Sequence, residues 1–205
     1  MQEEATPNRS PNTLRIEIPR WTWPVLVVIA ACVPFLGGLS LTNIFHVRDL
    51  TMFFWPQHLF IRQLLLAGEW PSCDPWAGAG QAMGPNALNQ MFLPPVLLLR
   101  VLFPAIVGFN LIVATPFPLA ALGTWLFLRR RLDGSSAALG ALAFALGGPM
   151  VSTGNVPNLS WSIAWLPWTL WAVEHDRASV SLRTLALVAL FTAFQMLSGE
   201  PVTMI

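Results

Sequence analysis

Long apolar stretches separated by short polar ones form the main pattern along this chain of 205 residues. A helix needs about 20 apolar residues to cross the hydrocarbon core of a bilayer, where no water can satisfy its backbone. Measured against that length, five stretches are candidate spans. They cover residues 23–41, 106–128, 137–151, 159–173 and 185–197. We therefore predict an all-α fold, a polytopic membrane helical bundle of about five transmembrane helices.

Two polar regions lie outside this pattern. Residues 1–20 are rich in Pro, Asn and Glu, which predicts a disordered cytosolic tail before a membrane domain over residues 21–205. Residues 42–105 separate the first two candidate spans and are expected to form one large loop. Inside the second span, Pro116 and Pro118 each remove a backbone donor, so a bend is predicted there.

Composition agrees with a membrane protein and excludes other classes. Hydrophobic residues make up 55% of the chain and charged ones 10%, against roughly 25% charged in soluble domains. All basic residues are Arg and none gathers into a broad cationic face, so no nucleic-acid partner is expected. Cys32 and Cys73 are too few for a disulfide framework or a zinc site. The segment ending at Cys32 resembles a lipoprotein cleavage box, but the apolar stretch continues to Leu41, which favours a span.

The arginines predict an orientation. Those close to the candidate spans all fall on one side of the bundle, at Arg15, Arg20, Arg129–Arg131, Arg177 and Arg183. The positive-inside rule makes that side the cytosol, with the N-terminus cytosolic and residues 42–105, 152–158 and 198–201 outside. An odd number of spans leaves the C-terminus outside without a polar tail, so the chain is expected to be incomplete.

The outer loop contains further elements. Residues 51–67 alternate apolar and polar positions with the helical period, which predicts an amphipathic interfacial helix ended by Gly68. Residues 69–86 combine Pro, Gly and Trp and are expected to form an ordered loop at the membrane surface. Residues 91–103 are apolar but short for a span, so a second interfacial or re-entrant helix is expected.

Ionisable residues of this loop are the candidates for chemistry. Asp49 follows the first span and could act as a general base or bind a divalent metal, or it could simply pair with Arg48. His58 and Arg62 lie one helical turn apart and could face a lipid phosphate together, although Arg62 could instead snorkel to headgroups.

Weaker candidates complete the set. Glu69 and Asp74 lie beside turn-forming Pro and Trp residues, where structural caps are expected. Glu200 follows the fifth span and could join the same site. Six tryptophans are expected to form an interfacial belt, with platforms for sugar rings as the alternative. They are Trp70, Trp76, Trp161, Trp165, Trp168 and Trp171.

The order of these features resembles a known family. Asp49 after a span, an amphipathic helix ending in Gly68, Pro-x-x-Asp-Pro-Trp at 71–76, Gly-x-Gly at 78–80, Asn86, Pro94-Pro95 and the Gly-Glu-Pro turn at 199–201 resemble the YfhO-like bacterial multi-pass membrane proteins. These are grouped with the GT-C glycosyltransferases, and the resemblance covers residues 20–205, their N-terminal part. Family members typically have ten or more spans.

The resemblance implies an activity in the bacterial cytoplasmic (inner) membrane. A sugar would pass from a polyprenyl-phosphate carrier to a cell-envelope acceptor on the outer face. Asp49 would be the base or a ligand of a divalent metal such as Mg²⁺ or Mn²⁺, and His58 or Arg62 would hold the donor phosphate. The alternatives are a transporter or lipid-handling protein without catalysis, and an inactive N-terminal fragment.

Overall fold

The computed structural model describes residues 19, 21–39, 41–77, 80–84, 86–175 and 181–199. Most of them are helical. The N-terminal part contains α1 (Thr22–Cys32), η1 (Val33–Leu39), the π-helical turn η2 (Leu50–Phe54), α2 (Trp55–Leu66), β1 (Cys73–Asp74), β2 (Gln81–Ala82) and η3 (Ala87–Asn89). The remainder contains α3 (Pro94–Leu102), α4 (Ala105–Ala114), α5 (Pro116–Leu128), α6 (Gly134–Ala145), α7 (Gly148–Ser152), η4 (Thr153–Asn155), α8 (Pro157–His175) and α9 (Leu182–Leu197).

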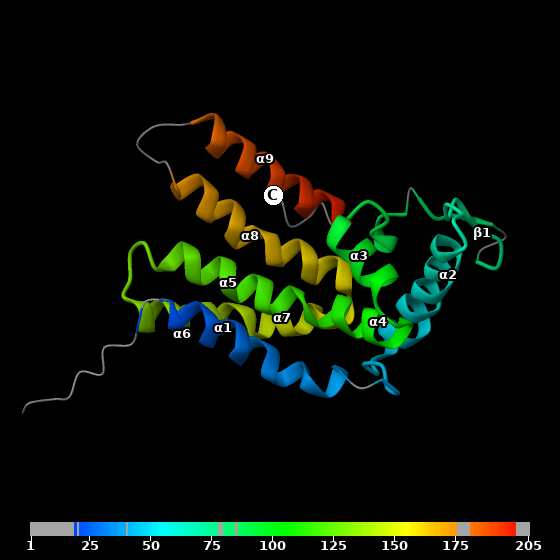
Figure 1. The fold of residues 1–205 in the computed structure, drawn as a ribbon, viewed down its shortest axis with the longest axis horizontal. Coiled ribbons are helices and arrows are strands. Elements are labelled where there is room, and N and C mark those ends of the chain that lie inside the picture. The colour runs from blue at the N-terminus through cyan, green and yellow to red at the C-terminus, as the bar shows by residue number, and fades with distance from the viewer. Residues whose placement is uncertain are drawn as a thin grey trace, which may run out of the picture.

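Five helices run side by side along the long axis of the molecule (Figure 1). Helix α5 is central and packs against α1, α6 and α8, while α9 covers α8. Alanines of α5 and α6, including Ala120, Ala121 and Ala141, are fully buried where these helices meet. Their small side chains allow the backbones to approach closely. The predicted all-α class is therefore confirmed for the described residues, with one short antiparallel β1–β2 pair beside the helices.

Each of the five stretches expected from the apolar pattern contains helix, although the first ends at Leu39 among the described residues and the third is interrupted between Ala145 and Gly148. Two helices, Ala105–Leu128 and Gly134–Asn155, are long and apolar enough to cross a membrane, and Thr22–Gly38 and Leu182–Leu197 are shorter apolar helices. Regular α-helix is interrupted at Thr115, immediately before Pro116, yet the Thr115 N–H still bonds the Leu111 carbonyl. The disturbance expected from the prolines is thus confined to one residue between α4 and α5.

The chain reversals gather the connections at two ends of the bundle. One end, called the arginine end, holds Trp23, Arg129–Arg131 and His175, and the start of α9 lies at the same end (Figure 1). The other, called the loop end, holds the described residues of 41–104, the α4 residues that contact them, η4 and Ser198. At the arginine end Asp133 begins α6 by accepting from the N–H groups of Ser135 and Ser136. Hydrogen bonds from the Ser135 side chain, then the Ser136 side chain and backbone, hold the pKa of its carboxyl well below the usual range.

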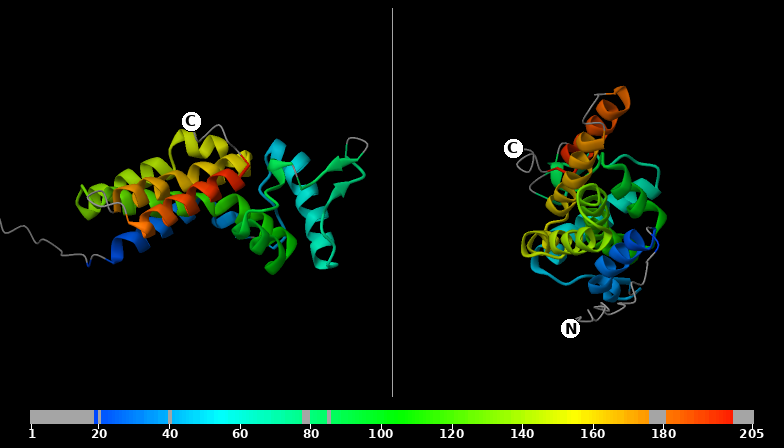
Figure 2. Two further views of the ribbon diagram at one scale, coloured as in Figure 1. Left: turned by 90° about the horizontal axis from the view of Figure 1, so that it is seen from above. Right: turned by 90° about the vertical axis from the view of Figure 1, so that its left-hand side faces the viewer.

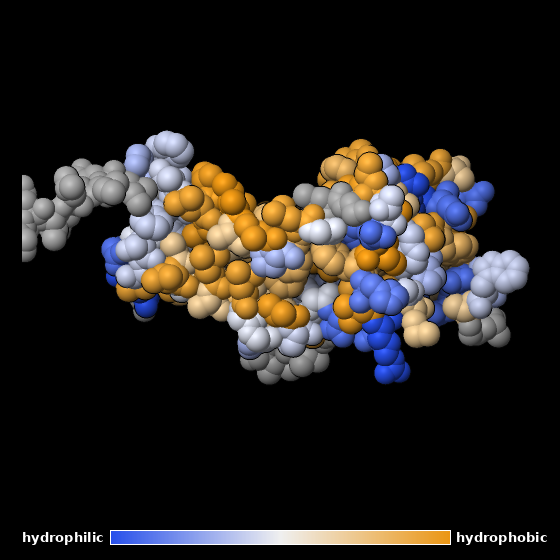
Figure 3. Space-filling view, turned by 90° about the horizontal axis from the view of Figure 1, so that it is seen from below, coloured by the Kyte–Doolittle hydropathy of each residue, from blue (hydrophilic) through white to orange (hydrophobic). Residues whose placement is uncertain are grey.

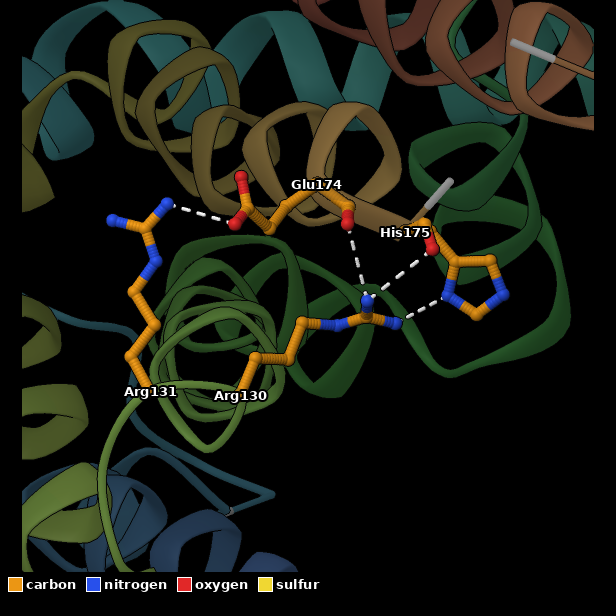
Figure 4. A network of polar contacts seen from close by, with 4 residues as sticks. All are labelled: Arg130, Arg131, Glu174 and His175. Atoms are coloured by element: carbon orange, nitrogen blue, oxygen red, sulfur yellow. Dashed lines mark hydrogen bonds and ion pairs between the residues drawn. The ribbon is translucent and has the colours of Figure 1, made fainter. Parts of the chain in front are cut away.

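Polar contacts fasten α5 to α8 at the arginine end (Figure 4). Arg131 forms an ion pair of 2.7 Å with Glu174, and Arg130 donates to the carbonyl of Glu174 and to the ring of His175. Arg130 also lies over the ring of Trp171, 5.9 Å from its centroid. The described arginines expected on one side, including Arg183, therefore do share one end of the fold.

Helix α2 lies across the loop end, transverse to the bundle, with the β1–β2 pair beyond it (Figures 1 and 2). The amphipathic helix predicted over residues 51–67 is present as η2 followed by α2. It ends as expected at Gly68, whose φ of 76° places it in the left-handed region that favours glycine. The short helix expected over residues 91–103 is α3, which begins at Pro94 and ends at Leu102.

The tryptophans of α8 do not form a belt. Trp161 is 1% exposed and its indole N–H donates to the Ile112 carbonyl, and Trp165 is also buried. The indole N–H of Trp168 donates to the carbonyl of Leu119. The prediction of interfacial placement is wrong for Trp161 and Trp165, because their rings fill the space between α8, α4 and α9.

Candidate active site

Asp49 lies at the loop end, immediately before η2, with an exposed side chain. The amide Nδ2 of Asn155, the last residue of η4, lies 3.5 Å from its Oδ2. Arg48 forms no ion pair with Asp49, so the charge pair considered as the alternative role is absent from the described structure. The carboxylate therefore faces the turn between α7 and α8.

A buried asparagine positions the segment that carries Asp49. The side chain of Asn110 on α4 is 1% exposed, donates to the carbonyl of Asn43 at 2.9 Å and accepts from the N–H of Phe45 at 3.1 Å. Leu50, also 1% exposed, packs against Phe109 and Val113 of the same helix. These contacts fasten residues 43–50 to α4 on both sides of the turn that leads to Asp49.

An apolar cavity of about 340 Å³ opens beside Asp49. Val47 and Leu50, which flank Asp49 in the sequence, line it, and so does its partner Asn155. The rest of the wall is mainly apolar and comes from η1, α4, α5, α7, η4 and the segment between η1 and η2. These residues include Phe35, Phe45, Val113, Phe117 and Val151. The cavity is therefore an apolar space next to the Asp49 segment, of a kind suited to a hydrocarbon chain, and Asn155 links its wall to the Asp49 carboxylate.

His58 and Arg62 have partners other than a ligand. His58 is 2% exposed, its Nε2–H donates to the carbonyl of Ala105, and its ring stacks on Trp55. Burial, then the charge of Arg100, lowers the pKa of His58 from 6.5 to about 3 despite the bond to Ala105, so the ring is neutral. Arg62 donates to the carbonyl of Phe103. Both side chains fasten α2 to the turn between α3 and α4.

The acidic candidates of the loop lie apart from Asp49. One Asp74 carboxylate oxygen accepts from the N–H of Trp76 at 2.9 Å, which is the structural turn expected there. Asp74 also lines a cavity of about 330 Å³ between α2 and the β1–β2 pair, and no residue lining that cavity lines the one beside Asp49. Glu69 is exposed at the end of α2. Glu200 lies outside the described residues.

Metal ligands are sparse around Asp49. No group of three or more His, Cys, Asp or Glu side chains comes together within the described ranges. A single carboxylate with a neighbouring amide does not make a protein cage for a divalent ion. It does suit Mg²⁺ or Mn²⁺ shared with the phosphates of a substrate, because Mg²⁺ commonly takes one or two carboxylates and keeps its other ligands as water or phosphate.

Three polar residues at the loop end were not predicted from the sequence. Asn110 and Arg100 are single polar residues within apolar stretches, and that isolation is a signal that could have identified them. Asn155 lies in a turn, where asparagine is common, so nothing in the sequence connects it with Asp49. Only the fold brings η4 next to η2.

Comparison of the chain with models of protein families, with curated proteins and with solved structures finds no match in any of the three.

Proposed function

We propose that this chain is a multi-pass protein of the bacterial cytoplasmic membrane, with the helices of the bundle crossing the bilayer. The support is the exposed apolar surface of the long helices. Only 28% of the most apolar window of Gly134–Asn155 is buried, and Leu139 on that helix is 72% exposed. On the face in Figure 3, hydrophobic residues cover the bundle and the most hydrophilic ones lie toward its ends. A soluble monomer rarely exposes so large an apolar area.

The proposed orientation places the arginine end in the cytosol and the loop end outside. Arg129–Arg131 follow α5 at the first of these ends and Arg183 lies in the first turn of α9, which starts there, as the positive-inside rule requires. Because α2 lies across the loop end, it would run parallel to the outer membrane surface, where its amphipathic pattern fits.

The loop end would then transfer a sugar from a polyprenyl-phosphate donor to an acceptor of the cell envelope. The observation that carries this proposal is that Asn155, whose amide lies 3.5 Å from the Asp49 carboxylate, also lines the apolar cavity. The cavity would take part of the polyprenyl chain, and the sugar would lie beside Asp49. The resemblance to YfhO-like GT-C proteins agrees with a first-loop acidic residue in that role.

The proposed reaction uses Asp49 as the base. Its carboxylate takes the proton of an acceptor hydroxyl, the hydroxyl oxygen bonds to the anomeric carbon, and the bond from that carbon to the phosphate oxygen breaks. Polyprenyl phosphate leaves with the electron pair. If a divalent ion takes part instead, Asp49 would be its protein ligand, and the ion would supply positive charge for the leaving phosphate.

The test is transfer from a panel of radiolabelled polyprenyl-phosphate sugars to envelope acceptors in membrane vesicles containing the protein. Asp49→Asn keeps the size of the side chain and removes the base, so transfer should fall at least about 100-fold. Glu174→Gln, a carboxylate change at the arginine end, is the matched control and should retain transfer. Membrane levels of both variants must equal those of the unmodified protein.

Equal transfer by the Asp49→Asn variant and the unmodified protein would overturn the proposal. Saturable binding of the donor without any transfer would favour a lipid-handling protein.

A further inference from the structure

A second polar site lies inside the loop end, where α3 meets α2 and α4. Arg100 on α3 is 5% exposed. Its Nη2 donates to the carbonyl of Asn89 at 3.2 Å and its Nη1 lies 3.9 Å from the sulfur of Met91, but its Nε–H is buried without an acceptor. No carboxylate of the described residues pairs with this guanidinium. Burial lowers its pKa only to about 10, so the group carries its charge at neutral pH.

Gln90 brings a second unsatisfied donor to the same place. It is 4% exposed, and its side-chain Nε2 is buried without an acceptor. Its φ of 50° is the one left-handed value among the non-glycine residues that the structure describes. Residues other than Gly, Asn and Asp adopt this conformation with difficulty, and such strain is often found at functional sites.

Both residues line one small cavity. It measures about 20 Å³ and is lined by Gln90, Arg100 and His58 and by apolar side chains that include Phe54, Phe109 and Ile112. This is room for about one particle of the size of water. His58 donates through Nε2 to Ala105 and is neutral, so its remaining ring nitrogen is an acceptor. The donors available for a ligand are therefore the Nε–H of Arg100 and the amide of Gln90.

We propose that this cavity binds one small monovalent anion of the chloride class, held by Arg100 and Gln90. A buried guanidinium without a counter-charge is strongly unfavourable, and a neutral water would leave that charge uncompensated. A phosphate or a carboxylate ligand is too large for the space. The bound anion joins α3 to Gln90, the residue after η3, and thereby stabilises this part of the loop end without a direct part in catalysis.

The first experiment measures the thermal midpoint of the purified full chain in a nonionic detergent. Sodium gluconate is replaced stepwise by sodium chloride or bromide at constant ionic strength. Binding to the folded state alone raises the midpoint saturably, by about 3–6 °C when the anion is at ten times its dissociation constant. A midpoint that does not respond to the halides overturns the proposal and leaves the cavity as a water site.

Variants locate the effect. Gln90→Glu supplies a carboxylate beside Arg100, so this variant should be at least as stable in gluconate as the parent is in chloride, and its halide response should be lost. Arg100→Met should also lose the response, and the exposed Arg48→Met should keep it. Bromide-soaked crystals should give an anomalous peak within hydrogen-bond distance of the Arg100 side chain. A halide response that persists in Gln90→Glu, or a peak at other positions only, would show an adventitious ion only and contradict the assignment.

Discussion

His58 was a candidate for ligand binding, but its side chain is buried and has a structural role. Its position one turn before Arg62 suggested a phosphate site, yet the ring is enclosed by Trp55 and Phe109 and bonded to Ala105. Sequence spacing shows that two side chains share a helix face, but it does not show what covers that face. The carbonyls of Phe103 and Ala105, which receive these side chains, come from a turn more than forty residues away.

The lowered pKa of His58 predicts a dependence of stability on pH. The pKa falls from 6.5 in the unfolded chain to about 3 in the folded one, so the unfolded state binds the proton first. Stability from this group is complete above pH 6.5 and is lost as the pH falls toward 3. Between pH 7 and pH 5 the loss is about 2 kcal/mol.

Denaturant titrations of the unmodified protein and of His58→Gln at both pH values measure this loss. The variant keeps a donor for Ala105 but has no titrating ring, so its stability should change by about 2 kcal/mol less. His46→Gln, a change at an exposed histidine, controls for other titrating groups. A pH dependence that is the same with and without the His58 ring would contradict the burial argument.

At the scale of elements, the helices could be predicted and their connections could not. The apolar pattern located the helices of the bundle, Gly68 marked the end of α2, and the helix expected over residues 91–103 is α3, which begins three residues later, at Pro94. These signals are local, because they depend on backbone geometry and on helical spacing. The contact between η4 and η2 is not local: it depends on how α6, α7 and α8 stack on α5, so the pairing of Asn155 with Asp49 could not be predicted.

The tight contact between α5 and α8 depends on a glycine. A Cβ at Gly123 would lie 2.6 Å from the Trp168 ring, whose N–H bonds the Leu119 carbonyl. Gly123→Ala should therefore displace the indole and lower the free energy of unfolding by about 1–3 kcal/mol. The comparison is Gly148→Ala, where a Cβ meets nothing within 4 Å. Unfolding in detergent, followed by tryptophan fluorescence, should rank the Gly123 variant well below the Gly148 variant. Equal free energies of unfolding for the two variants would contradict the tight contact between α5 and α8 at Gly123.

At the scale of the whole molecule, an apolar bundle joins two ends of opposite character. At the arginine end the cations lie over aromatic rings; Arg129, for example, lies 4.8 Å from the centroid of the Trp125 ring. The loop end contains Asp49, the cavity beside it and the buried Arg100. The composition of the chain and the positions of its arginines predict this division. Which side chains meet inside the loop end depends on the fold, because residues 42–104 contain few strong periodic signals.

The most direct test of this arrangement uses the cysteine that the loop end already contains. Cys73 is free and exposed on β1, whereas Cys32 is half-buried on α1 and can be replaced by Ala. In spheroplasts, a membrane-impermeant maleimide should label Cys73 without permeabilisation. In a Cys73→Ser background, Leu132→Cys at the arginine end should be labelled only after the membrane is opened. The opposite labelling pattern, or release of the chain from membranes by alkaline carbonate, would contradict the membrane bundle and its outward-facing loop end.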